Sequence, residues 1–382
     1  MLRIVKAKRI WQYLTDVNKR SIFVHVPLTY PVEPFNGEMI TGFLTPLFNE
    51  KSVYPTSLKQ DIVEKHNAEP MFDVQVGLAG YKNLETEKMI EGVYKMTDTQ
   101  MKIMKDYAQR KDWDFCMGVV LGTDRMQHTM WRFHDEKHRK HPGETPYKNT
   151  LKEYYKYIDK HIGELKEILG DDVVFIVASD HGFDRMDGRF NLNDWLIKEG
   201  YLVLKETPTE PTKLRFDNVD WSKTRVYAVG AYFGRLYFNK ISRDPDNGIL
   251  QEGEVEPLQN ELITKLTAIQ SDRGEELQTP TYKPQDIYEG PYAKNGPDLY
   301  VYFDNLRWGV NNDVGNEGMY SQKTTKGSDD AGHAPTGMFC VSHPSFRKNY
   351  CTDMTVLDVL PTIFKVMGLH VPSDFRGRIL VD

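Results

Sequence analysis

The chain alternates short apolar runs with longer amphipathic stretches. Three apolar runs are rich in β-branched and aromatic residues and predict strands: 21–26 (SIFVHV), 114–121 (DFCMGVVL) and 172–178 (DVVFIVA). Helical periodicity precedes the last two, over residues 84–110 and 146–169, and the second helix is expected to end at Gly170. Strands that alternate with helices are typical of parallel βαβ units. The pattern therefore predicts an α/β fold, a mainly parallel sheet with helices on both faces, in which the three runs are central strands.

The pattern of predicted elements changes at residues 201–320. Short strand-like runs, a charged helix and many turn residues replace the regular alternation. This change predicts a smaller inserted α+β subdomain that shapes the substrate site, with the metal-binding α/β core formed by residues 1–200 and 321–382. The apolar run at residues 337–341 and the amphipathic stretch at residues 356–363 then predict a return to the main sheet and a closing helix.

Composition narrows the class of protein. Of 382 residues, 40% are hydrophobic and 27% are charged, which is typical of a globular protein with a large core. The net charge is -6 and no long basic stripe occurs, so a nucleic acid polymer is not expected as a partner. Three scattered cysteines (Cys116, Cys340 and Cys351) indicate reduced, buried thiols rather than a disulfide framework.

No apolar run approaches the roughly 20 residues that cross a bilayer, so no membrane segment is expected in this chain. The basic amino end (MLRIVKAKRIW) lacks the apolar stretch of a signal peptide. We therefore expect a cytoplasmic protein, although a signal peptide upstream of Met1 would change that expectation.

Polar clusters follow two of the predicted strands, which is where ligands bind in open α/β sheets. The first cluster (GTDRMQH) places Asp124 and His128 four residues apart, on one face of a helical turn. A carboxylate and an imidazole in this arrangement can chelate one divalent cation. The same spacing arises by chance in many helices, so the pair alone does not establish a metal site.

The second cluster (SDHG) contains the adjacent residues Asp180 and His181. Two adjacent ligands require a tight turn around the metal, which Gly182 permits; an Asp that caps the following helix is the alternative. His333 lies in a glycine-flanked segment (GHAPTG), where the alternative to a ligand is an exposed loop histidine. Together, two Asp and three His at strand ends form an N/O ligand set that suits zinc, with manganese or iron as alternatives.

Three blocks of the sequence resemble one enzyme family: residues 122–131 (GTDRMQHTMW), 174–201 (VFIVASDHGFDRMDGRFNLNDWLIKEGY) and 332–337 (GHAPTG). They are similar to the type I phosphodiesterase/nucleotide pyrophosphatase branch of the alkaline phosphatase superfamily. The opening block VPLTYPVEPFNGEMITGFLTP and the closing block DVLPTIFKVMGLHVPSDFRGRIL also resemble segments of that branch. The likeness runs in order over most of the chain.

The resemblance implies a hydrolase that uses two divalent metal ions, most often zinc, to cleave phosphodiester or pyrophosphate bonds of small substrates. By position, one metal is expected at Asp124, His128 and His333. The other is expected at Asp180 and His181, together with an early Asp and the nucleophilic Thr or Ser.

In the family, the early Asp and the nucleophile precede the segment with which this chain begins. The resemblance therefore implies a catalytic nucleophile upstream of Met1 and an incomplete second metal site. Thr29 and Thr41 lie in blocks that match other parts of the family pattern, so neither is expected to replace the nucleophile. We expect a fragment of a longer enzyme; a natural short form with little turnover is the alternative.

The shared metal ligands leave three functions open. The first is the phosphodiesterase/nucleotide pyrophosphatase activity, which the block NLNDWLIKEGY favours. The second is another branch of the superfamily, such as a cofactor-independent phosphoglycerate mutase or a phosphonate hydrolase. The third is a catalytically inactive module that binds metal or phosphate. The sequence indicates neither the substrate-binding residues nor the oligomeric state.

Overall fold

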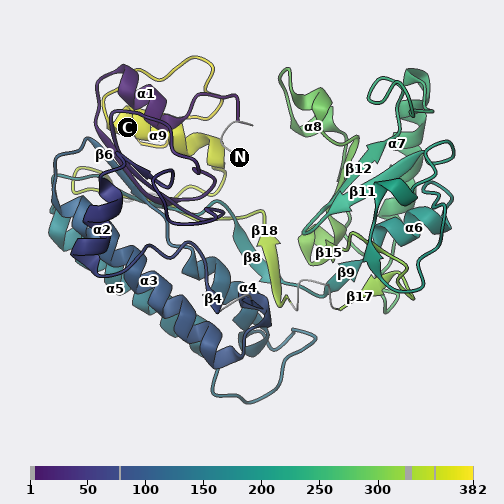
Figure 1. Ribbon diagram of the computed structural model, residues 1–382, viewed down its shortest axis with the longest axis horizontal. Coiled ribbons are helices and arrows are strands. Elements are labelled where there is room, and N and C mark those ends of the chain that lie inside the picture. The colour runs from purple at the N-terminus through teal and green to yellow at the C-terminus, as the bar shows by residue number, and fades with distance from the viewer. Residues whose placement is uncertain (1–4, 77–78, 323–328, 348–349, 382) are drawn as a thin grey trace. The chain divides into compact units, whose positions relative to one another are not determined.

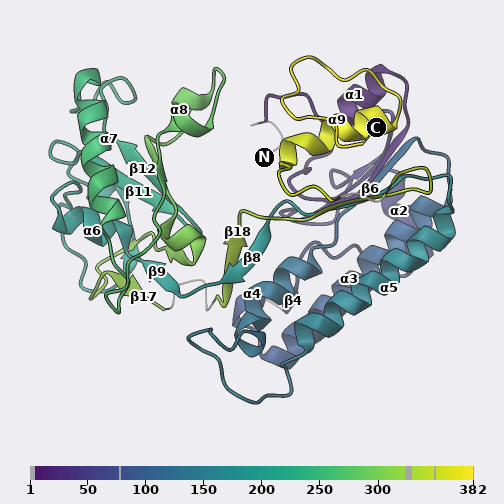
Figure 2. The ribbon, with the colours of Figure 1, turned by 180° about the vertical axis from the view of Figure 1, so that it is seen from behind.

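The computed structural model describes residues 5–76, 79–322, 329–347 and 350–381. The chain divides into two compact units, shown from opposite sides in Figures 1 and 2. Unit 1 comprises residues 1–126, 149–180 and 337–382, and unit 2 comprises residues 127–148 and 181–336. The segment expected to be an inserted subdomain, residues 201–320, lies within unit 2. Its role in shaping a substrate site stays a prediction.

Unit 1 is built on a four-stranded sheet with the order β3-β2-β1-β6. Its strands are β1 (Ser21–Val26), β2 (Gly37–Thr41), β3 (Val53–Tyr54) and β6 (Phe115–Gly118). The central strand β1 runs parallel to β2 and β6, and β3 runs antiparallel to β2. This arrangement confirms the α/β class and places residues 21–26 inside the sheet. Strand β6, from the run 114–121, lies at the edge of the sheet, so the prediction that it is a central strand is wrong.

Helices cover both faces of this sheet. They are α1 (Ile10–Asp16), α2 (Leu58–His66), α3 (Thr86–Gln109), α5 (Thr150–Leu169) and α9 (Val359–Val366). Alternate residues of β1 face opposite sides. Ile22 and Val24 pack in a core that includes residues of α2, α3 and α5, whereas Phe23 packs with Trp11 of α1. In Figure 1, α3 and α5 lie on one side of the sheet and α1 and α9 on the other.

Strand β7 (Phe175–Ala178) differs from the expected arrangement. It pairs antiparallel with β19 (Phe339–Ser342) in a separate two-stranded sheet, and neither strand joins β1 or β6. The apolar run therefore predicted the strand correctly but not its neighbour, because hydrophobicity indicates burial and carries no information about pairing. The expected return of residues 337–341 likewise leads to β7 and not to the four-stranded sheet.

Unit 2 contains an antiparallel sheet with the order β11-β12-β14-β13. Its strands are β11 (Val226–Gly230), β12 (Gly234–Phe238), β13 (Thr281–Tyr282) and β14 (Leu299–Val301). Helices α6 (Leu192–Lys198) and α7 (Glu252–Thr267) pack on one face, where Leu196 and Leu262 meet Leu236 in a separate hydrophobic core. Figure 2 shows both helices on the same side of β11 and β12.

The remaining α-helices and strands of the described residues are as follows. They are α4 (Gly122–His134), α8 (Pro284–Ile287), β4 (Gln75–Val76), β5 (Ala79–Gly80), β8 (Gly182–Arg185), β9 (Gly188–Phe190), β10 (Thr212–Lys213), β15 (Trp308–Val310), β16 (Asp313–Val314), β17 (Tyr320–Ser321) and β18 (Ala331–Ala334). Strands β8 and β18 form an antiparallel pair, and β9 pairs with both β15 and β17.

The structure also bears on the expectations about membrane segments and cysteines. Among the described residues, no helix combines the length and apolar character that crossing a bilayer requires. The three cysteines are free, as expected, but Cys340 and Cys351 are exposed, so the prediction that all three are buried is wrong.

Candidate metal site

Helix α4 carries two of the candidate ligands, and its first turn is fixed by close packing in unit 1. It begins at Gly122, where a Cβ atom would lie 1.9 Å from the hydroxyl of Tyr154 and 2.7 Å from the hydroxyl of Thr97. Those two hydroxyls are hydrogen-bonded to each other at 2.7 Å. Only glycine fits this approach, and Asp124 follows two residues later.

Arg125 anchors the same turn of α4. Its side chain is buried and bonds both carboxylate oxygens of Asp73, at 2.6 and 3.0 Å. The guanidinium lies 4.5 Å from the ring centroids of Phe43 and Tyr81, and it also pairs with Asp124. Burial works against the charged form, but the bonds and charge of Asp73 outweigh it and raise the pKa of Arg125. The turn that presents Asp124 is therefore tied to unit 1 by a charged pair.

The structure brings Asp124, His128 and His333 together. Each offers one ligand atom, and these atoms all lie within 4.8 Å of one another. Asp124 and His128 share one face of α4, as their spacing predicts, and His333 comes from β18. A carboxylate oxygen and two imidazole nitrogens at this separation form a donor set that fits zinc.

His128 is the most buried of the three, and aromatic rings surround it. Its ring centroid lies 4.9 Å from Phe183, 5.3 Å from His333 and 5.6 Å from Tyr232. Phe183 of β8 is the cross-strand partner of His333 in the β8–β18 pair. The strand pairing thus sets the position of His333 against His128.

His181 and Asp180 lie outside the group formed by the other three candidate ligands. The ring of His181 stacks on His333, with a centroid distance of 3.6 Å and an interplanar angle of 16°. Asp180 is exposed and belongs to unit 1, whereas His181 belongs to unit 2.

Gly182 has a different role from the expected one. It begins strand β8 and is not among the positive-φ glycines, whereas Asp180, two residues earlier, lies in a bend of the chain. The turn expected around a metal at Asp180 and His181 stays a prediction. A Cβ atom at Gly182 would lie 2.0 Å from the carbonyl oxygen of Thr336, so the glycine permits close backbone contact. Because a strand follows, the alternative of Asp180 as a helix cap does not apply.

Thr29 and Thr41 are both buried, and their hydroxyls bond within unit 1. The Thr29 hydroxyl donates to the carbonyl oxygen of Val26 at 2.7 Å. The Thr41 hydroxyl donates to the carbonyl oxygen of Ser52 at 3.1 Å.

Sequence reasoning missed three residues beside His128. Asp329 and Tyr232 each lie within hydrogen-bond distance of its ring, and Arg189 pairs with Asp329. An Asp-Asp pair four residues before His333 was the available signal for Asp329. Tyr232 lies in the turn between β11 and β12, and the sequence carried no signal that it would contact His128, because the position of Tyr232 depends on the fold of unit 2.

Asp330, the neighbour of Asp329, has its own environment. Its carboxylate pairs with Arg132 at 3.2 Å, and its backbone N–H donates to the carbonyl oxygen of His128 at 2.9 Å. Burial raises the pKa of Asp330 to about 6.

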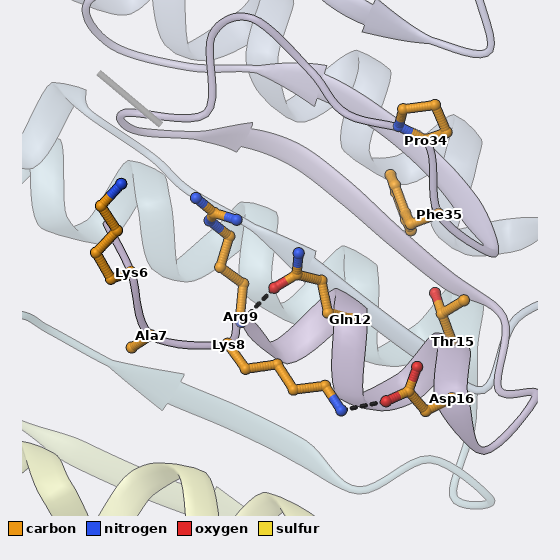
Figure 3. A pocket seen from close by; sticks show the side chains of 9 residues that line it. All are labelled: Lys6, Ala7, Lys8, Arg9, Gln12, Thr15, Asp16, Pro34 and Phe35. Carbon is orange, nitrogen blue, oxygen red and sulfur yellow. Dashed lines mark hydrogen bonds and ion pairs between the residues drawn. The ribbon is translucent and has the colours of Figure 1, made fainter. Parts of the chain in front are cut away.

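A pocket in unit 1 is lined by residues 6–9, 12, 15, 16, 34 and 35, and none of these is a candidate ligand. Figure 3 shows its basic lining residues Lys6, Lys8 and Arg9. Lys8 pairs with Asp16, and the backbone N–H of Arg9 donates to Gln12 at 2.9 Å.

Comparisons with known proteins connect the site with a family. The model of the type I phosphodiesterase/nucleotide pyrophosphatase family matches residues 3–329, a range that includes Asp124, His128, Asp180 and His181 and ends before His333. A search of the curated proteins gave no significant match.

Two solved structures of murine ectonucleotide pyrophosphatase/phosphodiesterase 5 also match. An inactive variant in complex with AMP is 12% identical with a TM-score of 0.45, and a second structure of that murine protein is 13% identical with a TM-score of 0.44. Each match covers 96% of this chain and 72% of the murine chain. The family match extends over most of the sequence and includes both polar clusters; the chain therefore belongs to the type I phosphodiesterase/nucleotide pyrophosphatase family, a family of hydrolases.

Proposed function

We propose that this protein is a metal-dependent hydrolase that cleaves phosphodiester or pyrophosphate bonds of small substrates by a two-metal mechanism. The observation that carries the proposal is the convergence of Asp124, His128 and His333 in a member of this family. Three protein ligands leave a fourth position of a tetrahedral ion open, which is the arrangement of catalytic zinc sites.

The donor chemistry supports one metal at these three residues. Asp124 supplies a hard carboxylate oxygen and remains half-buried, with its side chain 19% exposed. His128 and His333 supply imidazole nitrogens from a helix and a strand that are separately anchored. Imidazole with carboxylate suits zinc, and manganese is the alternative.

We assign Asp180 and His181 to a second metal. The parallel stacking of His181 on His333 supports this assignment, because it places the two imidazoles in contact. When bound, the paired metals would act as Lewis acids on the attacking and leaving oxygens of an in-line displacement. The protein's own side chains hold the ligands in place and enclose His128 among aromatic rings that exclude water.

A hydrolysis assay tests the proposal. Metal-free full-length protein, including any residues encoded upstream of Met1, is supplied with zinc or manganese and given bis-p-nitrophenyl phosphate or p-nitrophenyl phosphate. We expect metal-stimulated release of nitrophenol with preference for the diester. A preference for the monoester would contradict the phosphodiesterase assignment, and hydrolysis that does not respond to metal would contradict metal dependence.

Metal binding gives a test that does not depend on turnover. We expect His128→Ala and His333→Ala each to lower zinc affinity by more than the roughly 10- to 100-fold that loss of an outer partner costs, since each removes a direct ligand. Binding is measured by competition with a chromophoric chelator and by elemental analysis.

His134→Ala is the matched control, because His134 lies on the same helix and is exposed. Its zinc affinity should equal that of the wild type. Unchanged metal content in both ligand variants would show that the ligand assignment is wrong.

A further inference from the structure

The imidazole of His128 makes two short contacts through one of its nitrogens. Nδ1 lies 2.9 Å from a carboxylate oxygen of Asp329 and 2.8 Å from the carbonyl oxygen of Ala331. A carbonyl oxygen can only accept a hydrogen bond, and an ionised carboxylate likewise. Both contacts are therefore satisfied when Nδ1 carries the proton.

A proton on Nδ1 leaves the lone pair of the neutral ring on Nε2. The hydroxyl of Tyr232 lies 3.2 Å from Nε2, so it is placed to donate to that lone pair. The same lone pair is what a metal ion would take, because imidazole binds metals as the neutral ring.

Asp329 is itself held in place. One carboxylate oxygen faces His128, and the other accepts a bond from Arg189 at 3.0 Å. Arg189 also donates to the carbonyl oxygen of Ala231 at 2.9 Å, next to Tyr232. These contacts form a closed ring within unit 2 that runs from Arg189 through Asp329, His128 and Tyr232.

Burial makes these contacts strong. The side chains of His128 and Asp329 are 2% and 3% exposed. Water therefore screens the pair poorly, and the guanidinium of Arg189 places a positive charge beside the same carboxylate.

We propose that Asp329 is a positioning residue that fixes the Nδ1–H tautomer of His128 and directs Nε2 toward the metal bound with Asp124 and His333. The proposal rests on the proposed function in one respect, namely that a metal is the partner of Nε2. A carboxylate that accepts from the far nitrogen of a metal-binding histidine sets ring orientation and raises ligand basicity. Loss of such a partner costs about 10- to 100-fold in metal affinity.

The first test reads the tautomer in the metal-free wild-type protein, with no substitution. Long-range ¹H–¹⁵N correlation spectra distinguish a protonated ring nitrogen from an unprotonated one, and His128→Gln assigns the signals. We expect a protonated Nδ1 and an unprotonated Nε2. A proton on Nε2, or on both nitrogens, would overturn the proposal whether or not the protein binds metal.

The second test measures zinc affinity in Asp329→Asn, whose amide can donate to Nδ1 and so permit the other tautomer. We expect affinity to fall about 10- to 100-fold and the ¹⁵N signals to shift toward the Nε2–H form. Asp330→Asn is the matched control, since it is the same change at the adjacent buried position, where the carboxylate pairs with Arg132. It should leave the tautomer unchanged and the affinity within about threefold.

Equal affinity in Asp329→Asn and the wild type, with both folded by circular dichroism, would contradict the proposal. If the wild type binds no zinc, the proposed function fails but the tautomer result still stands. If Asp329→Asn does not fold, Asp329→Glu keeps the acceptor, and we expect it to retain the Nδ1–H signal.

Discussion

At the scale of single residues, the first turn of α4 depends on one buried cation. Arg125 is 4% exposed and lies between two aromatic rings, so its charge requires compensation. Asp73 supplies that compensation through two bonds from one guanidinium. A lysine could not make the same paired contact, because its ammonium is a single point of charge.

We expect Asp73→Asn to lower the free energy of unfolding by about 1 to 3 kcal/mol, because it weakens charge-assisted bonds to a buried guanidinium. Zinc affinity should fall as well, because Arg125 also pairs with the proposed ligand Asp124, and a displaced guanidinium would shift that carboxylate. Urea unfolding and chelator competition measure the two effects. Asp61→Asn, on the exposed side of α2, is the control and should change neither.

His25 gives a residue-scale prediction about pH. The ring is buried in the sheet of unit 1, and burial lowers its pKa to about 4. The folded state therefore favours the neutral ring, whereas the unfolded chain protonates near pH 6.5. Stability from this residue is complete above about pH 6.5 and is lost as the pH falls toward 4, by up to about 3 kcal/mol.

Urea unfolding between pH 7 and pH 4 measures this loss. His25→Gln should be less stable at pH 7 but should show a flatter dependence over that range. If the free energy of unfolding of the variant depends equally steeply on pH, groups other than His25 cause the acid sensitivity.

At the scale of elements, the helix that presents Asp124 and His128 begins where only glycine fits. A side chain at Gly122 would collide with the hydroxyls of Tyr154 on α5 and Thr97 on α3. The alignment of α4 is therefore decided by the helices that precede and follow it along the chain. The spacing of Asp124 and His128 follows from the helix, but the placement of the pair follows from this contact.

We expect Gly122→Ala to lower the free energy of unfolding by about 1 to 3 kcal/mol through overpacking, and to weaken zinc binding by moving the first turn. Thermal unfolding and chelator competition measure both changes. Gly163→Ala in α5 is the matched control, because no atom lies within 4 Å of its Cβ position. It should stabilise the helix by about 0.5 to 1 kcal/mol.

The double variant Gly122→Ala/Tyr154→Phe removes the nearest colliding oxygen. It should recover part of the zinc affinity that Gly122→Ala loses. No recovery would show that this contact is not the cause.

At the scale of the whole molecule, the chain forms two units with separate hydrophobic cores. The core of unit 1 gathers β1 and β2 with α2, α3 and α5, and that of unit 2 gathers the antiparallel sheet with α6 and α7. The core of unit 1 combines residues from two separate stretches of sequence, 22–108 and 165–169, whereas the core of unit 2 lies within the single stretch 190–310.

We expect core substitutions to act within their own unit. Leu262→Ala in unit 2 removes a fully buried side chain and should cost about 2 to 5 kcal/mol. Hydrogen exchange should then rise in β11, β12 and α7 before it rises in β1 and β2. Ile22→Ala is the reciprocal variant in unit 1, and a uniform rise in both variants would contradict the division.

Much of the local structure could be predicted from the pattern of residues. The strand at residues 21–26 and the helix that ends at Gly170, where φ is +76°, match the structure because hydrophobic period and end signals act over a few residues. The α/β class followed from their alternation. The pairing of β7 with β19 could not be predicted in this way, because the two strands lie more than 150 residues apart in sequence.

The sequence by itself determined the chemical types available: a carboxylate and an imidazole on one helical face, further histidines after predicted strands, and the family to which the chain belongs. Only the tertiary structure decided which of them meet. His333 reaches His128 through the β8–β18 pair, and Asp329 bonds His128 across 201 positions of sequence. Local periodicity fixes which face of an element a side chain occupies, whereas contacts between distant elements depend on how the cores pack.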